Sequence, residues 1–289
     1  AEKSTIVGLG VYIWNCEETL KLVLMLKAVR PELIIVLGGP EVSYESGEQA
    51  ICAAADYTIT GWGDISFAQL CAQILAGQAP EAKIIPGIQA KLDDLASPYA
   101  EYTEEDIRQR HLYVEASRGC PFKCEFCLSA LDKTAWPFAL ENFLADLEML
   151  WQKGARQFKF VDRTFNLKIE TSLRIMDFFL GKIAENPEDP PFAHFELIPD
   201  HLPEKLKEAI QRFPAGTLQF EIGIQTFNVE VQARISRKQK NELARDNILW
   251  LAQNSGAHLH GFPGQSFGEG FNKLVALNPH EIQFGILKR

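Results

Sequence analysis

Residues 118–127, with the sequence RGCPFKCEFC, organise this chain because they place three cysteines, Cys120, Cys124 and Cys127, on one short segment. Three thiolates so close together can ligate three irons of a [4Fe–4S] cluster, which leaves the fourth iron open to a small molecule. A structural zinc site would need a fourth Cys or His nearby, and the nearest downstream histidine is His194. A disulfide needs an oxidising compartment, which nothing else in the chain supports. The spacing therefore predicts a cluster with one open coordination position.

The C-x3-C-x2-C spacing resembles the signature of the radical S-adenosylmethionine (SAM) superfamily, in which an aromatic residue, here Phe126, precedes the third cysteine. The resemblance implies that the open iron binds the amino and carboxylate groups of SAM. It also implies that the reduced cluster cleaves SAM to a 5′-deoxyadenosyl radical, with a low-potential electron donor such as flavodoxin or ferredoxin as partner.

Length and charge narrow the class of protein. The chain has 289 residues, enough for two domains at ~100–200 residues each. The net charge of −9 argues against a nucleic-acid partner, because phosphate binding needs a basic surface. No apolar run approaches the ~20 residues needed to span a bilayer, and the six cysteines follow no secreted pattern, which indicates a cytoplasmic protein. The chain opens at Ala1 and enters a strand almost at once, so we expect its true beginning to be missing.

The first part of the chain alternates short apolar runs with segments of helical periodicity, and glycines follow each run. This pattern predicts a doubly wound parallel sheet in a domain spanning 1–77, followed by a linker over 78–110. A small hairpin is predicted within that linker, over 83–89. The predicted strands are 5–11, 33–37 and 57–60, and the predicted helices are 17–29, 45–55 and 66–75.

The second part, 111–289, repeats strand then helix more regularly and predicts a partial (βα)6 TIM-type barrel, which is also the fold of the radical SAM family. Reactive groups of such barrels lie at the carboxyl ends of the strands, and the cysteines directly follow the first predicted strand. The predicted strands are 112–116, 157–161, 193–198, 218–224, 257–260 and 282–287, and the predicted helices are 138–153, 170–184, 203–212, 241–254 and 269–277.

Residues 220–228, FEIGIQTFN, resemble the fourth-strand segment of oxygen-independent coproporphyrinogen oxidase and its radical SAM relatives. There a Gly-x-Gln ends the strand and an arginine twelve residues later meets the SAM carboxylate. Gln225 and Arg237 keep that spacing, so the resemblance implies both as SAM ligands, with Arg234 as the fallback for the carboxylate. An amide can hydrogen-bond ribose hydroxyls, and a guanidinium can bind a carboxylate through two bonds. The alternative is a strand-end glutamine and a solvated arginine.

Two acidic residues are implied as further SAM contacts by the same relatives. Residues 195–200, FELIPD, resemble a Glu-x-x-Pro segment that contacts SAM and so point to Glu196. The alternative that this carboxylate points into a helix layer stays open. Asp162, at the end of the second barrel strand, occupies the place where family members approach the methionine amine.

Residues 261–266, GFPGQS, resemble the Gly-Leu-Pro-Gly-Glu-Thr turn found after the fifth strand in many of these enzymes. The strand before it is very short and lacks the expected acidic residue, so no ligand is assigned from that strand. We expect His258 and His260 to be satisfied barrel histidines rather than metal ligands.

Three segments of the first domain, YIWN at 12–15, GGPEVS at 38–43 and GWGD at 61–64, resemble the cobalamin-binding domain found ahead of many radical SAM proteins. Glycine turns after parallel strands allow a nucleotide tail to approach the backbone closely. The segment departs from the pattern at Trp62 and Asp64, where glutamates are common, and a docking domain without cofactor is the alternative. The implied cobalamin-binding residues are Tyr12, Gly38, Gly39, Pro40, Ser43, Gly61 and Gly63.

Together these features predict a cobalamin-dependent radical SAM enzyme that modifies an unactivated carbon of a small-molecule or peptide substrate by methyl transfer. A cobalamin-free radical SAM enzyme is one alternative. A methylthiotransferase with a second cluster on Cys16, Cys52 and Cys71 is another, although Cys52 and Cys71 lie in helical runs where cysteine behaves as a small hydrophobe. An iron–sulfur electron carrier or sensor is the alternative outside enzymes, but carriers normally close all four corners with protein ligands.

Overall fold

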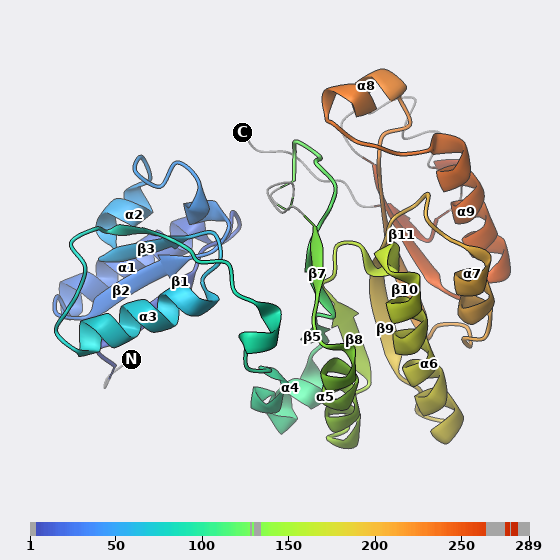
Figure 1. Ribbon diagram of the computed structural model, residues 1–289, viewed down its shortest axis with the longest axis horizontal. Helices are drawn as coiled ribbons and strands as arrows, with labels where there is room; N and C mark the ends of the chain where they lie inside the picture. Colours follow the sequence, from blue (N-terminus) through green and yellow to red (C-terminus); the bar gives the residue numbers. More distant parts are fainter. Residues whose placement is uncertain (1–3, 128, 130–133, 264–274, 278, 283–289) are drawn as a thin grey trace. The chain divides into compact units, whose positions relative to one another are not determined.

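The computed structural model describes residues 4–127, 129, 134–263, 275–277 and 279–282 (Figure 1). The chain forms two compact units, Ala1–Leu95 and Ala96–Arg289. The domain limits predicted at 77 and 111 remain predictions. No helix in the described residues is long and apolar enough to cross a membrane.

Unit 1 is built on a four-stranded parallel sheet whose strands follow one another in sequence order. The fourth strand was not predicted: residues 84–86 pair in parallel with the third strand, so the hairpin expected over 83–89 is wrong. A lone hairpin is marginal in water, whereas an existing sheet edge offers backbone partners. The strands are β1 (Ile6–Gly10), β2 (Ile34–Gly38), β3 (Tyr57–Thr60) and β4 (Ile84–Pro86).

Helices cover both faces of this sheet, as a doubly wound fold requires. Side chains of Ile35 and Leu37 on β2 pack with α1 (Cys16–Val29) and α2 (Ala50–Ala54). The intervening Val36 packs on the opposite side with Leu70 of α3 (Asp64–Leu75), because successive side chains of a strand point to opposite faces. Helix α2 is shorter than predicted: Glu45 has φ +48, and turns precede the helix.

Unit 2 contains a six-stranded parallel sheet in the order β12-β11-β10-β9-β8-β5. Within the described residues no pairing joins the two outer strands, so this is an open sheet. The predicted parallel α/β class is confirmed, and the partial (βα)6 barrel stays a prediction. The strands are β5 (Leu112–Val114), β8 (Gln157–Phe160), β9 (Phe192–Leu197), β10 (Leu218–Gln225), β11 (His258–Pro263) and β12 (Glu281–Ile282). The helices are α4 (Glu104–Gln109), α5 (Leu140–Gln152), α6 (Ile169–Glu185), α7 (Glu204–Gln211), α8 (Val229–Arg234) and α9 (Asn241–Asn254).

One face of the unit 2 sheet is an aromatic core that packs on the helices. Phe158, Phe160, Phe195 and Phe220 are fully buried, and Phe158 meets Phe179 of α6 edge-to-face at 5.3 Å between ring centroids. Strand alternation then directs the polar residues between these phenylalanines to the other face of the sheet. The core therefore determines which side chains can line a site.

The cysteine segment leaves this sheet differently from the prediction. Strand β5 ends at Val114, and a second strand, β6 (Ser117–Gly119), pairs antiparallel with β7 (Ala135–Pro137). The cysteines therefore follow β6 rather than the first barrel strand, which corrects the single strand predicted over 112–116. Most of the predicted helix 269–277, the turn after 263 and the strand beyond 282 lie outside the described residues.

Candidate functional site

Unit 2 has a pocket of about 270 Å³ at the carboxyl ends of its strands, where the chain segments that follow β6, β8, β9 and β10 come together. All three cysteines of the motif line this pocket. It is lined by Cys120, Phe122, Cys124, Phe126, Cys127, Ser129, Arg163, Thr164, Glu196, Leu197, Ile198, Asp200, Glu221, Gly223, Gln225, Arg237 and Lys238. Of the eight residues predicted to ligate the cluster or contact SAM, seven line the pocket: Cys120, Cys124, Cys127, Phe126, Glu196, Gln225 and Arg237.

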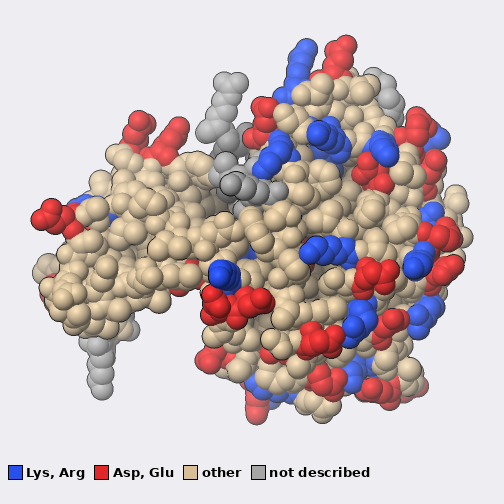
Figure 2. All heavy atoms as spheres, in the orientation of Figure 1, with Lys and Arg blue, Asp and Glu red and all other residues tan. Residues whose placement is uncertain are grey.

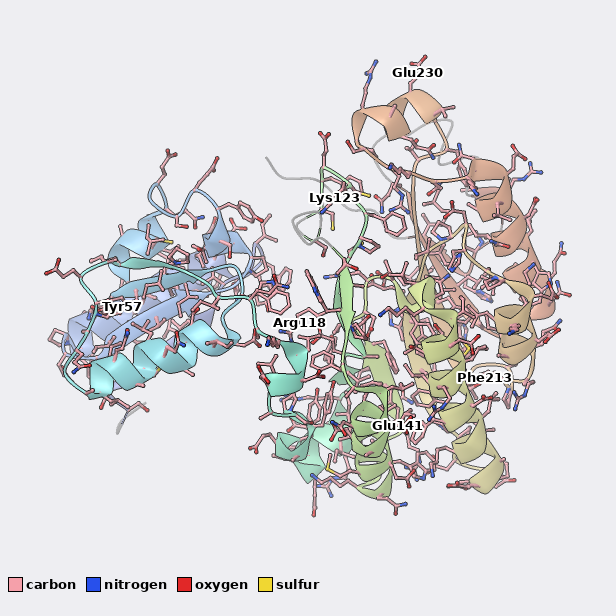
Figure 3. The ribbon with its side chains drawn as sticks, viewed as in Figure 1. Tyr57, Arg118, Lys123, Glu141, Phe213 and Glu230 are labelled. Carbon is pink, nitrogen blue, oxygen red and sulfur yellow. The ribbon has the colours of Figure 1, made fainter. Side chains whose placement is uncertain are left out.

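The cysteine loop is held by two hydrogen bonds to the segment after α8. The Glu125 N–H donates to the Ile235 carbonyl at 3.1 Å, and the Ser236 hydroxyl donates to the Glu125 carboxylate at 2.7 Å. The label of Lys123 in Figure 3 marks this loop. Cys124 is buried, and burial raises the pKa of the Cys120 thiol.

No three His, Cys, Asp or Glu side chains of the described residues converge on a single metal ion. A [4Fe–4S] cluster makes a different demand, because each thiolate binds its own iron and the sulfurs need not meet at one point. Three cysteines around one cavity meet that demand.

Arg237 joins the cysteines to the end of β10. Its Nη1 lies 3.7 Å from the Cys124 sulfur, and its Nη2 donates to the Gly223 carbonyl. Its Nε is buried and has no hydrogen-bond partner among the described residues. A buried donor without a partner costs about 1–3 kcal/mol, so an anionic ligand in the pocket has a donor to bind.

Gln225 ends β10 with φ +60, a backbone conformation that residues other than glycine rarely adopt. The pairing with β11 shifts register between Gly223 and Gln225, so the ladder is irregular where the amide enters the pocket. A Cβ on Gly223 would stand 3.3 Å from the Gln225 Nε2, and glycine leaves that space to the amide. Strained residues of this kind cluster at ligand sites.

Glu196 faces the pocket rather than the helix layer, which removes the alternative left open by the sequence. Its Oε1 lies 3.1 Å from the Arg163 guanidinium, and it is paired in register with Glu221 of β10. Burial raises the pKa of Glu196 to about 7, with Arg163 opposing the shift and Glu221 adding to it. The group therefore exchanges its proton near neutral pH.

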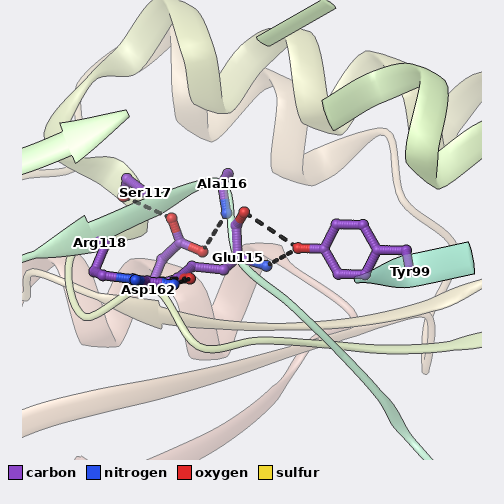
Figure 4. Close-up of polar contacts among 6 residues, drawn as sticks. All are labelled: Tyr99, Glu115, Ala116, Ser117, Arg118 and Asp162. Atoms are coloured by element: carbon purple, nitrogen blue, oxygen red, sulfur yellow. Dashed lines mark hydrogen bonds and ion pairs between the residues drawn. The ribbon is translucent and has the colours of Figure 1, made fainter. Parts of the chain in front are cut away.

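Asp162 does not line this pocket. Its buried carboxylate accepts hydrogen bonds from the Ala116 N–H at 2.9 Å and the Ser117 hydroxyl at 2.6 Å (Figure 4). It borders a separate cavity of about 20 Å³. Burial raises the pKa of Asp162 to about 6, and the two hydrogen bonds oppose the shift. The structure does not bring this predicted contact to the cysteines.

Thr164, Glu221 and Lys238 are among the lining residues that the sequence analysis did not predict. The Thr164 hydroxyl is buried without a hydrogen-bond partner among the described residues, and no motif marks a threonine after a strand. Glu221 precedes Gly223 by two positions and so shares its face, a signal that strand alternation could have provided. Lys238, next to Arg237, carried no signal.

Ser43 and three of the predicted cobalamin-binding glycines, Gly38, Gly39 and Gly61, lie at the carboxyl edge of the unit 1 sheet. The Ser43 hydroxyl donates to the Gly39 carbonyl at 2.7 Å and accepts from the Gly61 N–H at 2.9 Å. The Val11 N–H donates to the Gly38 carbonyl at 2.7 Å. Gly39 has φ +110, and a Cβ there would lie 2.5 Å from the Val11 carbonyl oxygen, so only glycine fits.

The other predicted residues of this edge are exposed or begin helices. Tyr12 stacks on Trp14 with ring centroids 4.6 Å apart, and Trp14 is 74% exposed. Pro40 precedes the short 3-10 helix Glu41–Ser43, and Gly63 precedes α3. The edge therefore combines close-packed glycine backbone with exposed aromatic rings.

The cysteines outside the motif and the two histidines of β11, His258 and His260, contact neighbouring protein groups. Cys16 and Cys52 are packed in one hydrophobic cluster on α1 and α2, and Cys71 lies on α3, which covers the other face. His260 contacts the Gln219 amide at 3.0 Å, and the His258 ring meets that of His280 edge-to-face.

Acidic and basic side chains are interspersed over the visible face of unit 2 (Figure 2).

The radical SAM superfamily matches residues 114–269. An uncharacterized methyltransferase, PH0819, of Pyrococcus horikoshii is 28% identical over 177 residues, which cover 52% of this chain and 38% of that protein. The cobalamin-dependent radical SAM methyltransferase TokK of Streptomyces tokunonensis is 25% identical over 190 residues, covering 56% of this chain and 28% of that protein. The matched regions thus span well under half the length of these relatives.

Two solved structures share the fold over nearly the whole chain. The radical SAM methyltransferase TsrM from Kitasatospora setae matches with a TM-score of 0.75 at 13% identity, covering 99% of this chain and 63% of that chain. The cobalamin-dependent SAM radical enzyme OxsB matches with a TM-score of 0.71 at 14% identity, covering 96% and 44%. Both matches extend over unit 1 as well as unit 2.

Proposed function

This chain belongs to the radical SAM superfamily, and we propose that it uses a [4Fe–4S] cluster and cobalamin to methylate an unactivated carbon of a small-molecule or peptide substrate. The observation that carries the proposal is the unit 2 pocket, where three cysteines, an arginine with a free buried donor and a strained glutamine line one cavity. The match with TokK supports the class of reaction.

In this proposal Cys120, Cys124 and Cys127 each ligate one iron. The fourth iron is then open to SAM in the pocket. A cluster held by these cysteines and reduced by one electron would supply the electron for cleavage of the sulfonium–C5′ bond of SAM into methionine and a 5′-deoxyadenosyl radical. A low-potential donor such as flavodoxin or ferredoxin has to deliver that electron.

The residues around the cluster orient SAM. Arg237 binds the carboxylate through its free Nε and its Nη groups, since a guanidinium presents a planar fork of donors. Gln225 and the Thr164 hydroxyl offer hydrogen bonds to the ribose or the methionyl end, and Phe126 supplies an apolar wall. Glu196 accepts a hydrogen bond from a ligand donor in the same pocket. Asp162 is left out of this ligand set because its carboxylate is turned to the backbone.

Cobalamin is proposed to bind at the carboxyl edge of the unit 1 sheet, through Tyr12, Gly38, Gly39, Pro40, Ser43, Gly61 and Gly63. When bound, it supplies the methyl group. A Cβ at Gly61 would meet nothing within 4 Å, so the backbone there is open to the close approach of a bulky ligand. The exposed aromatic pair provides an apolar contact surface. The fold shared with TsrM and OxsB over both units supports this assignment.

Anaerobic reconstitution tests the proposal. Protein supplied with iron, sulfide and hydroxocobalamin is desalted, and its visible absorbance, iron and sulfide are measured. On addition of SAM and a reductant, we expect 5′-deoxyadenosine and S-adenosylhomocysteine, and neither from a variant with all three motif cysteines changed to alanine. SAM cleavage by a protein that retains no corrinoid would support the cobalamin-free alternative. A cluster that leaves SAM intact would support an electron carrier.

A further inference from the structure

The segment between β5 and β6 turns the chain out of the sheet and toward the cysteines, and it is anchored from two sides. The Tyr99 hydroxyl accepts from the Glu115 N–H at 2.8 Å, and the Phe138 N–H donates to the Ala116 carbonyl at 3.0 Å. The Val161 N–H donates to the Val114 carbonyl at 3.0 Å, which is the last link of the β5–β8 ladder before the turn. Residues 115–117 therefore form a bend, and the antiparallel pair of β6 and β7, called the hairpin below, follows it.

Asp162 supplies the contacts on the β8 side of this bend. Its two carboxylate oxygens each take one donor, from Ala116 and from Ser117, as Figure 4 shows. The residue is 2% exposed, and hydrogen bonds to an ionised acceptor are stronger and more directional than neutral ones. Burying a carboxylate costs free energy. Its presence beside the bend therefore indicates that the orientation of the Ala116 N–H and the Ser117 hydroxyl is important.

The chain between the bend and the first cysteine has little freedom. Strand β6 pairs with β7 from Ser117 to Gly119, and Cys120 follows immediately. Gly119 has φ +96, and a Cβ there would lie 2.5 Å from the Thr134 carbonyl oxygen. The Arg118 guanidinium also pairs with the Glu115 carboxylate at 2.8 Å across the bend. A change in the bend is therefore passed on to Cys120 rather than absorbed.

We propose that Asp162 is a positioning residue for the cluster: by fixing the β5–β6 bend, its carboxylate sets where β6 delivers Cys120 at the rim of the pocket. The proposal rests on the ligation of the cluster by the motif cysteines. It assigns to Asp162 a role through the backbone in place of the predicted contact with SAM.

Two variants and one control test this role. Asp162→Ala removes both acceptors, and Asp162→Asn keeps one oxygen acceptor but replaces the other with a donor. Asn247→Ala is the matched control, because Asn247 is also buried and its amide donates to the Pro199 carbonyl at 3.0 Å, away from the hairpin. Its loss destabilises unit 2 without touching the bend.

The first measurement is amide hydrogen exchange of residues 116–119 in cluster-free protein, which does not depend on any activity. We expect exchange to accelerate about tenfold or more in Asp162→Ala, less in Asp162→Asn, and not in Asn247→Ala. The second is the electron paramagnetic resonance spectrum of the reduced, reconstituted protein with and without SAM. We expect Asp162→Ala to change the line shape per cluster, and Asn247→Ala to change only the yield of folded protein.

Unchanged exchange at residues 116–119 in Asp162→Ala would overturn the anchoring. Faster exchange with a wild-type spectrum per cluster would overturn the positioning role. Failure of the wild-type protein to assemble any cluster would instead refute the proposed function and, with it, this role, whatever the exchange data show. The three outcomes are distinguishable because exchange is read on the cluster-free chain.

Discussion

Replacing Arg237 by alanine is expected to weaken SAM binding without loss of the cluster. The guanidinium contacts the Cys124 sulfur and the Gly223 carbonyl, and its buried Nε is left without a partner among the described residues. A charge-assisted hydrogen bond is worth roughly 1.5–3 kcal/mol, which corresponds to about a 10- to 160-fold rise in the dissociation constant of SAM. Arg237→Lys keeps the charge but not the planar fork, so we expect only partial recovery.

The assay is anaerobic calorimetric titration of SAM into reconstituted protein, with iron content measured on the same samples. Arg234→Ala is the matched control, because Arg234 ends α8 three positions earlier, is exposed and does not line the pocket. Equal SAM affinity in wild type and Arg237→Ala, with full iron content in both, would refute the assignment. A larger loss in Arg234→Ala would transfer the carboxylate contact to that residue.

Three further predictions follow from the same geometry. Cys120→Ala should leave the reconstituted protein without an intact [4Fe–4S] cluster by iron and sulfide analysis, whereas Cys52→Ala, in the unit 1 core, should retain it; equal loss in both would contradict the ligand assignment. Gly39→Ala forces a Cβ to 2.5 Å from the Val11 carbonyl oxygen at φ +110, so it should lower the free energy of unfolding, measured in urea, by about 1–3 kcal/mol and reduce the corrinoid that is retained through desalting. Gly47→Ala, whose Cβ would meet nothing within 4 Å, should change neither quantity. Burial raises the pKa of Glu196 from 4.5 to about 7 in the folded state, which therefore binds this proton more tightly than the unfolded chain does. The free energy of unfolding of the wild-type protein should fall as the pH rises between those values, and Glu196→Gln should flatten that part of the stability curve by on the order of 3 kcal/mol. An unchanged slope would contradict the burial of an ionisable group there.

Short-range patterns in the sequence were sufficient for the elements and for the chemistry of the cysteine motif. The apolar run over 33–37 predicted β2, and the Gly-x-Gln before Arg237 predicted the end of β10, where Gln225 lines the pocket. These inferences succeed because strand alternation and ligand spacing are properties of neighbouring residues. The predicted fold class is confirmed for the same reason.

Contacts between distant residues decided the rest. The sequence shows that residue 162 is an aspartate but not where its carboxylate points. The packing of β8 against the β5–β6 bend directs that carboxylate to Ala116 and Ser117 and not to the pocket. Residues 84–86 pair with β3 because a sheet edge was available to them, which no local pattern encodes. The sequence by itself determined which residues could ligate iron and where most of the strands run, since both depend on spacing along the chain. Tertiary structure alone decided which side chains share a cavity, because that depends on which segments pack together.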